Sequence, residues 1–411
     1  MKRILMIAYH FPPVQGSSGV QRTLRFARYL PEFGWEPIIL TAHTRAYENT
    51  TPDQLADVPA GTVVVRAPAW DTARHLAIGG RYPGFLARPD RWLTWWLGAV
   101  PTGLGLIRKY APAAIWSTYP IATAHSIAAT LHARSGLPWI ADFRDPMAQD
   151  DYPEDPATWE SFARIERRAI EQASLSVFTT PSALELYRER YPRRTDSLAL
   201  LENGYDEETF TNAAAGEPLH PGKLTLLHSG IVYPSERDPT HLIAALARLK
   251  ASAPAIYGRL RIRFRAPVHA DLLYALAQRH GVDDVIETCP SIDYRDALAE
   301  MMRADGLLVL QAANCNAQIP AKLYEYFRAG RPIVALTDPA GDTAVTCRSA
   351  GISAIARLDD EAAIAGCLER FCTDPAAGTL ATAAAIAGAS RRGRTAELAR
   401  MLDATVLRAA A

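Results

Sequence analysis

The sequence predicts an α/β protein built from two Rossmann-like, doubly wound domains. Short apolar runs alternate with amphipathic stretches along the chain, which is the pattern of a parallel sheet covered by helices on both faces. The pattern occurs in both halves, with no sequence repeat between them. With 411 residues, the chain is too long for one ordinary core and suits two domains of roughly 200 residues each.

In the first half, the pattern predicts six strands separated by helices. The first helix, Gln21–Tyr29, has Leu24 and Ala27 spaced to face inward. The strands are Ile4–Ala8, Pro37–Thr41, Val63–Ala67, Ala114–Ser117, Trp139–Asp142 and Ser176–Thr179. The other helices are Leu104–Tyr110, Ala122–Arg134 and Trp159–Gln172.

The second half repeats this scheme. Its strands are Lys223–Ser229, Arg261–Arg265, Val285–Thr288, Gly306–Leu310 and Pro332–Ala335. Its helices are Pro239–Leu249, Ala270–His280, Tyr294–Arg303 and Ala321–Arg328. A second parallel sheet with helices on both faces follows from this order.

The domain boundary is expected near the loop-forming Asn203-Gly204 and the stretch that follows it. We therefore predict an N-terminal Rossmann-like domain of residues 1–205 and a C-terminal Rossmann-like domain of residues 206–390. Residues 391–411 are expected to form a helix that packs back toward the first domain. Ligands bind at the carboxyl ends of the strands in doubly wound sheets, so two such domains facing each other create one deep cleft.

Charge and cysteine content exclude several classes of protein. Lysine plus arginine and aspartate plus glutamate both total 44, so the net charge is zero, and we expect no nucleic-acid partner. The cysteines are odd in number and form no C-x-x-C pair, which favours a reducing compartment and argues against disulfides or a zinc site. They are Cys289, Cys315, Cys347, Cys367 and Cys372.

The apolar run near Met1 is too short for a signal sequence and ends in proline, so a buried strand is expected. No stretch has the roughly 18 apolar residues of a spanning helix, which favours a cytoplasmic protein. Trp92, Trp95 and Trp96, close to Arg91, could dock peripherally on the inner face of the membrane, where a lipid-linked acceptor would wait. Packing in the core is the alternative.

The loop Pro12–Val20 joins the first strand to the first helix and contains Gly16 and Gly19. Glycines let backbone approach a ligand, and the helix N-terminus offers free N–H groups. The alternative is a tight turn. A G-x-G-x-x-G fingerprint is absent, which argues against a dinucleotide site.

A charged cluster, Asp142, Arg144 and Asp145, follows the fifth strand. At the carboxyl end of a strand, two carboxylates and an arginine suit proton transfer or contact with an anion. The alternative is an internal salt bridge, and we expect at least one of the carboxylates to pair with Arg144.

Two segments of the second half suit a diphosphate. Gly230 ends a strand and Arg237 precedes a helix, although Arg237 could simply pair with Asp238. Pro320 can start a helix whose first turn carries Lys322, with Glu325 close by. The alternative there is a solvated Lys–Glu face.

Together these segments resemble the retaining glycosyltransferases of family 4 (the group 1 glycosyltransferases), which have the GT-B fold. The resemblance covers nearly the whole chain, in the order of the family's blocks. The blocks are His10–Pro13 with its glycine loop, Leu30–Thr41, Ser117–Pro120, Asp142–Pro146, Asn203–Asp206 and Ile319–Tyr326.

The resemblance implies transfer of a sugar, with retention of configuration, from a UDP- or GDP-linked donor to a glycan, lipid-linked or small-molecule acceptor. It implies that the domain of residues 1–205 binds the acceptor and the domain of residues 206–390 the nucleotide-sugar. It implies no metal and no cofactor, since the nucleotide-sugar is a substrate. Glu325 would hold the ribose; Lys322, Arg237 and the backbone around Ala321 and Leu323 would hold the diphosphate beside Gly230. Gly16 and Gly19 would lie under the sugar or the diphosphate. The loop Pro290–Ile292, with Ser291 and Ile292, would meet the nucleobase.

The sequence departs from the family at three positions. The first glutamate of the E-x7-E motif falls on Ala317, so contact with the distal hydroxyls must come from Asn314, Asn316 or Gln318. A histidine that many members carry falls on Arg144, which leaves Asp142 or Asp145 as carboxylate candidates. A basic residue after the strand-end glycine falls on Ile231.

Two other functions fit the sequence. A non-hydrolysing sugar-nucleotide epimerase shares the two-domain architecture and needs paired acid and base carboxylates. A catalytically silent nucleotide-sugar-binding protein would explain the missing carboxylate at Ala317.

Overall fold

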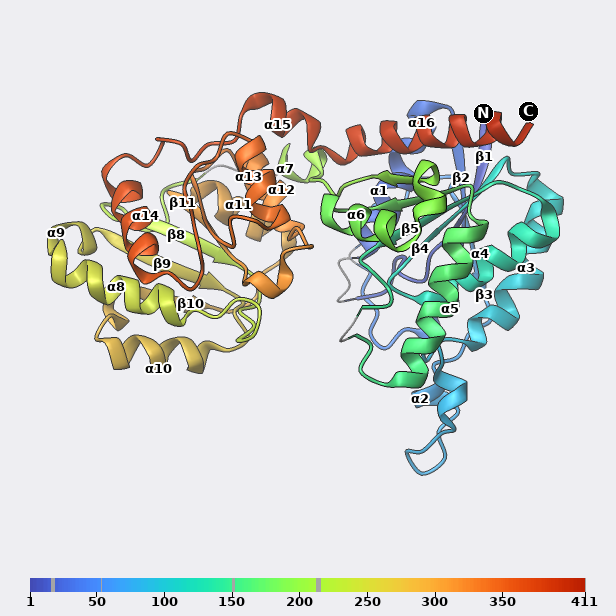
Figure 1. Ribbon diagram of the computed structural model, residues 1–411, viewed down its shortest axis with the longest axis horizontal. Helices are drawn as coiled ribbons and strands as arrows, with labels where there is room; N and C mark the ends of the chain where they lie inside the picture. The colour runs from blue at the N-terminus through green and yellow to red at the C-terminus, as the bar shows by residue number, and fades with distance from the viewer. Residues whose placement is uncertain (16–18, 53, 150–151, 212–215, 411) are drawn as a thin grey trace. The chain divides into compact units, whose positions relative to one another are not determined.

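The computed structural model describes residues 1–15, 19–52, 54–149, 152–211 and 216–410 (Figure 1). The chain forms two compact units. Unit 1 consists of Met1–Glu202 together with Arg391–Ala411, and unit 2 consists of Asn203–Ser390. Each unit is a parallel sheet with helices, as the sequence predicts.

Unit 1 contains a seven-stranded sheet in the order β3-β2-β1-β4-β5-β6-β7. The central strand β1 pairs in parallel with β2, Lys2 opposite Trp35, and with β4, Ile4 opposite Ala114. The strand order reverses between β1 and β4, which is where doubly wound sheets bind ligands. The strands are β1 Lys2–Ile7, β2 Trp35–Ala42, β3 Val63–Ala67, β4 Ala114–Thr118, β5 Trp139–Arg144, β6 Leu175–Phe178 and β7 Leu198–Leu200.

The helices of unit 1 cover this sheet, and the last helix of the chain is one of them. Helix α16 contacts α1, while α3 and α5 both contact α4. Leu398 and Leu402 of α16 are fully buried in the core of unit 1, and Trp35 Nε1 donates to Asp403 Oδ1 over 2.9 Å. The α-helices are α1 Gly19–Tyr29, α2 Thr72–His75, α3 Thr94–Tyr110, α4 Ala122–Ser135, α5 Pro156–Gln172, α6 Pro181–Arg190 and α16 Arg391–Ala410.

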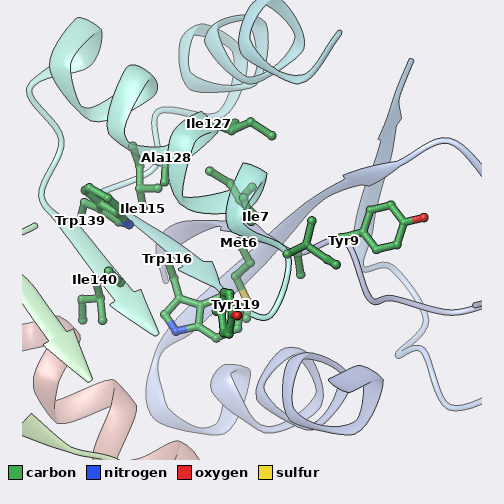
Figure 2. Packing of buried hydrophobic residues seen from close by; sticks show 14 of the residues in the cluster. Met6, Ile7, Tyr9, Ile115, Trp116, Tyr119, Ile127, Ala128, Trp139 and Ile140 are labelled. Carbon is green, nitrogen blue, oxygen red and sulfur yellow. The ribbon is translucent and has the colours of Figure 1, made fainter. Parts of the chain in front are cut away.

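The core of unit 1 is rich in tryptophan (Figure 2). Trp116 and Trp139, on neighbouring strands, are fully buried. Trp95 is also fully buried, while Trp92 and Trp96 are half-buried and pack against the same core. For these three side chains the structure shows packing against the core, which is the alternative to a membrane contact. Within the described residues, no helix combines the length and apolar character needed to cross a bilayer.

Unit 2 contains a six-stranded parallel sheet in the order β10-β9-β8-β11-β12-β13, so its order reverses between β8 and β11. The strands are β8 Leu224–Ser229, β9 Leu260–Arg265, β10 Ile286–Cys289, β11 Gly306–Leu310, β12 Ile333–Leu336 and β13 Ile355–Ala356. The α-helices are α7 Glu207–Thr211, α8 Thr240–Ser252, α9 Pro254–Tyr257, α10 Ala270–His280, α11 Tyr294–Arg303, α12 Lys322–Ala329, α13 Asp342–Ser349, α14 Glu361–Thr373 and α15 Ala383–Gly388.

Successive strand residues of unit 2 face two separate cores. Leu226 and Leu308 pack with residues of α8, α10 and α14. Their neighbours Leu227 and Leu307 pack with residues of α11, α12 and α13. Helix α12 is thereby fixed on one face of the sheet, and its N-terminus is held beside the carboxyl ends of the central strands.

Candidate functional site

The strand end at Gly230 in unit 2 is built for close approach of a cation. Gly230 has φ 121°, a conformation that side chains rarely adopt, and a Cβ there would lie 2.9 Å from Nζ of Lys322. Only glycine accommodates both the backbone conformation and the ammonium group. The structure thus brings together two residues that the sequence analysis proposed for donor binding, at the point where the strand order reverses.

Lys322 is held by a buried histidine. Nδ1 of His228 lies 2.9 Å from the carbonyl oxygen of Leu308, and a carbonyl only accepts, so Nδ1 carries the proton. Nε2 of His228 is then free to accept from Nζ of Lys322, 3.4 Å away. Burial and the charge on Lys322 hold the pKa of His228 well below its usual value, so His228 is a neutral acceptor.

The pKa of Lys322 is lowered to about 7, first by burial and then by the charge on Arg237, with Glu325 opposing. Arg237 donates from Nη1 to the carbonyl of Ile231 over 2.8 Å, and its guanidinium lies 5.1 Å from the ring centre of Tyr233. It is not paired with Asp238, whose carboxylate instead accepts from the backbone of Thr240. The positive charges of Lys322 and Arg237 have few carboxylates near them, so together they attract an anion.

Glu325 lies on the same helix, one turn beyond its start. Its Oε1 accepts from the Tyr294 hydroxyl over 2.6 Å. Tyr294 begins α11, directly after the loop that carries Ser291 and Ile292, both exposed. The loop proposed for the nucleobase and the glutamate proposed for the ribose are therefore joined by one hydrogen bond.

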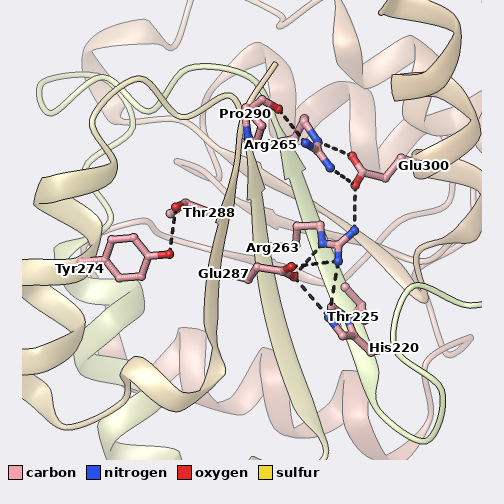
Figure 3. A network of polar contacts seen from close by, with 9 residues as sticks. All are labelled: His220, Thr225, Arg263, Arg265, Tyr274, Glu287, Thr288, Pro290 and Glu300. Carbon is pink, nitrogen blue, oxygen red and sulfur yellow. Dashed lines mark hydrogen bonds and ion pairs between the residues drawn. The ribbon is translucent and has the colours of Figure 1, made fainter. Parts of the chain in front are cut away.

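The other end of that loop is tied to the sheet by an arginine network (Figure 3). Arg265 Nη1 donates to the Pro290 carbonyl over 2.6 Å, and its Nη2 contacts Glu300 Oε1 at 2.6 Å. Arg263 contacts the same Glu300 oxygen at 2.9 Å and also pairs with Glu287. Such shared, charge-assisted hydrogen bonds fix the loop's position.

Ala321 and Leu323, the remaining residues proposed to bind the nucleotide-sugar, differ in exposure. Ala321 is exposed at the helix start, whereas the Leu323 side chain is fully buried and its N–H already bonds to the Pro320 carbonyl. Tyr326 places α12 against β8, because its hydroxyl accepts from the Ser229 N–H over 3.0 Å.

The three residues near Ala317 that could contact the distal hydroxyls of the sugar differ in their hydrogen bonds and exposure. Asn316 donates to Asp338 over 2.7 Å, and Asn314 donates to the Ser235 carbonyl over 3.3 Å. Gln318 has an exposed side chain. A cavity of about 220 Å³ lies nearby, but none of the predicted donor residues lines it. Its lining includes Ser235, Asp238, Gln311, Asp338 and Arg357.

In unit 1, Asp142 is fully buried and paired with Arg22 of α1. The pair is bidentate, with Nε–Oδ2 at 2.7 Å and Nη2–Oδ1 at 3.1 Å. Arg22 also donates to the carbonyls of Leu201 and Glu202. The expected pairing of Asp142 or Asp145 with Arg144 is wrong: in the described part of the chain, no ion pair joins Arg144 to either carboxylate.

Arg144 ends β5 at a register shift and has φ 58°. Its carbonyl accepts from the Thr179 hydroxyl over 2.6 Å. Burial lowers the pKa of its guanidinium, although Asp145 and Asp142 act in the opposite direction. Burial, and to a lesser extent the charge on Arg144, lowers the pKa of His10, which follows β1, to about 4.

Asp145 is exposed beside this arginine. Desolvation raises the pKa of its carboxyl, and the charge on Arg144 opposes that rise. The loop after it is anchored by Glu166, which accepts from the Ala148 N–H over 3.0 Å and from the Tyr187 hydroxyl over 2.6 Å. Gly19 is the buried first residue of α1, and Gly16 lies outside the described residues.

Several of these contacts escape sequence reasoning. His228 had a usable signal, since it directly precedes Ser229-Gly230 at the end of a predicted strand. Arg22 had none, because its partner is 120 positions away. Tyr294 was visible only as the start of a predicted helix.

Comparison with known proteins adds a domain family and a set of folds. Residues 18–204 match the model of the glycosyl transferase 4-like domain. No curated protein sequence matches the chain. Among solved structures, the chain is similar to trehalose 6-phosphate synthase from Burkholderia multivorans, with 14% identity, full coverage of both chains and a TM-score of 0.68.

Two further structures share the fold at equally low identity. Sucrose-phosphate synthase from Thermosynechococcus elongatus is 15% identical, with 99% of this chain and 97% of that chain covered and a TM-score of 0.61. Anabaena HepE, solved in complex with UDP, is 12% identical, with 100% and 98% covered and a TM-score of 0.63.

Proposed function

We propose that this chain, a glycosyltransferase with the GT-B fold and a glycosyl transferase 4-like N-terminal domain, transfers a sugar from a nucleoside-diphosphate donor with retention of configuration. One observation carries the proposal. Lys322, which lies beside Gly230, and Glu325 share the first turn of α12, so a site for a diphosphate adjoins an acceptor for ribose hydroxyls. Complexes of HepE with UDP and with UDP-glucose support a nucleotide-sugar as the donor.

The donor is activated through its leaving group. Negative charge develops on the diphosphate as the bond to the sugar breaks, and the cations of Lys322 and Arg237 stabilise it there. Since the α12 N-terminus adds a partial positive charge, protein groups suffice and the proposed reaction uses no metal ion.

Retention is supported by the resemblance to the retaining family and by the small number of groups that could act as the base of an inverting reaction. An inverting enzyme needs a base behind the sugar. Arg144 stays protonated, and Asp142 is engaged by Arg22, which leaves Asp145 as the carboxylate candidate. In the retaining reaction the departing diphosphate helps take the acceptor proton.

Three measurements test this function. Thermal shift against UDP, GDP, ADP and TDP should show one strongly stabilising nucleotide, because a ligand that binds the folded state raises its stability. With the matching nucleotide-sugars, release of free nucleotide should persist in excess EDTA, and proton NMR of the first product should show the donor's anomeric configuration. An inverted product would refute retention and identify Asp145 as the base; no response to any nucleotide would refute the donor site.

A further inference from the structure

Asp145 and Asp142 favour the charged form of Arg144 electrostatically, but neither carboxylate forms an ion pair with it among the described residues. The Nε atom of Arg144 is buried and has no hydrogen-bond partner among the described residues. The two nearest carboxylates in sequence do not supply one. Asp142 is saturated by the bidentate contact with Arg22, and Asp145 forms no described ion pair with the guanidinium. A buried guanidinium nitrogen without a hydrogen-bond partner lowers the stability of the folded state.

The backbone conformation of Arg144 adds to that cost. The residue has φ 58° without being glycine, and the Thr179 hydroxyl holds its carbonyl in place over 2.6 Å. Strained residues persist where the surrounding structure enforces them and are frequent at binding sites. The register of β5 against β6 shifts between Asp142 and Arg144, so the ladder is irregular where Arg144 ends the strand.

The neighbours of Arg144 favour a negative ligand. His10 has a pKa lowered to about 4 and is neutral at pH 7, so it adds a polar ring without charge. A planar guanidinium presents five N–H groups in a fork that fits two oxygens of a carboxylate or phosphate. A sugar hydroxyl would leave the positive charge uncompensated.

We propose that Arg144 binds an anionic group, a carboxylate or a phosphate, carried either by the transferred sugar or by the acceptor. The inference rests on the proposed function, and the group it binds is distinct from the donor diphosphate, which Lys322 and Arg237 hold. Binding of this anion by Arg144 makes the glycosyltransferase selective for an acidic or phosphorylated sugar.

The test uses the full chain and four variants: R144Q, R144K, D145N and the control R134Q. Arg134 is exposed in the last turn of α4, so R134Q makes the same charge change away from the strand ends. Ligand-detected NMR measures binding of inorganic phosphate, glucose 6-phosphate, glucuronate and glucose in the presence of UDP. Calorimetry compares UDP-glucuronic acid with UDP-glucose.

Wild type should bind at least one anionic probe about tenfold more tightly than its neutral match, as a charge-assisted hydrogen bond contributes. R144Q should abolish that preference, R144K should keep part of it, and R134Q should not change it. D145N should strengthen anion binding, because a repelling carboxylate is removed. A preference among free sugars assigns the anion to the acceptor, and a preference between the two donors assigns it to the transferred sugar.

Three results would overturn the proposal. The first is that R144Q removes no anion binding, and the second is that R144Q keeps the preference for anionic probes unchanged. The third is tenfold weaker UDP binding by R144Q, which would assign the anion to the diphosphate itself. Failure of wild type to bind any nucleoside diphosphate would instead refute the proposed function, and the anion measurement would still stand. The melting temperature of R144Q, expected to be no lower than that of wild type, shows that the variant is folded.

Discussion

Nζ of Lys322 lies 3.4 Å from Nε2 of His228, and the same ammonium group lies beside Gly230, whose missing side chain leaves room for it. The histidine accepts without being charged, so it orients the lysine and leaves its positive charge available. A lysine with a pKa near 7 changes charge in the physiological range. The affinity for a donor should therefore depend on pH.

We expect UDP affinity to fall by about tenfold per pH unit above pH 7, because binding requires the charged form of Lys322. UDP itself is fully ionised in that range. The sign follows from the lowered pKa: free Lys322 is protonated below about pH 7 and must take up a proton to bind at higher pH. Calorimetry between pH 7 and 9 measures the slope.

K322R is the matched variant for this prediction. An arginine stays charged throughout the range, so its affinity should not change with pH, whatever its absolute value. A wild-type slope of zero would contradict the coupling of Lys322 to the diphosphate.

Glu325→Ala should weaken UDP binding by about 1.5–3 kcal/mol, the contribution of a hydrogen bond to a charged group. Glu369, exposed on α14, provides the control, since Glu369→Ala makes the same change away from the strand ends. Isothermal titration measures both. Equal affinities in the two variants would remove Glu325 from the ribose site.

Asp142→Ala should lower the free energy of unfolding of unit 1 by about 3–5 kcal/mol, because it leaves Arg22 buried without its partner. Asp145→Ala, at an exposed position, should change it by less than about 0.5 kcal/mol. All eight tryptophans lie in unit 1, so fluorescence during urea unfolding follows that unit selectively. A fully stable Asp142→Ala that no longer turns over would show a direct chemical role.

Arg144→Gly should raise the free energy of unfolding of unit 1 by about 1 kcal/mol, since glycine adopts a φ of 58° without strain. The same urea experiment measures it. A destabilised variant would mean that the arginine contributes packing that outweighs its strain and unpaired charge.

The sequence predicts the elements best where local signals agree. Helices Ala270–His280 and Tyr294–Arg303 appear residue for residue. Helix α3 begins ten residues before the predicted Leu104 and continues through Pro101, a residue that usually interrupts a helix. Thr102 partly compensates by donating to the Gly98 carbonyl over 2.8 Å.

Some elements of the structure were not predicted from the sequence, for two different reasons. Strands β7 and β13 have only three and two residues, too few for a periodic pattern. Helix α6 had a readable start: Thr180 accepts from the Ala183 N–H and Pro181 occupies the first turn.

In the candidate site, too, the sequence predicts local relationships and misses contacts between distant positions. Lys322 and Glu325 could be proposed from spacing on one helix, since residues three apart lie on one face. The Asp142–Arg22 pair could not, because it joins positions 120 residues apart and only the strand order brings them together.

Helix α16 also has a consequence for synthesis of the protein. Its Leu398 and Leu402 complete the core of unit 1, yet the whole of unit 2 precedes it in the chain. A growing polypeptide therefore exposes the face of α1 that α16 covers until the ribosome has finished unit 2. Domains generally fold as units during translation, so unit 2, which is one contiguous segment, can reach its native state first, and unit 1 can close only after α16 has left the ribosome.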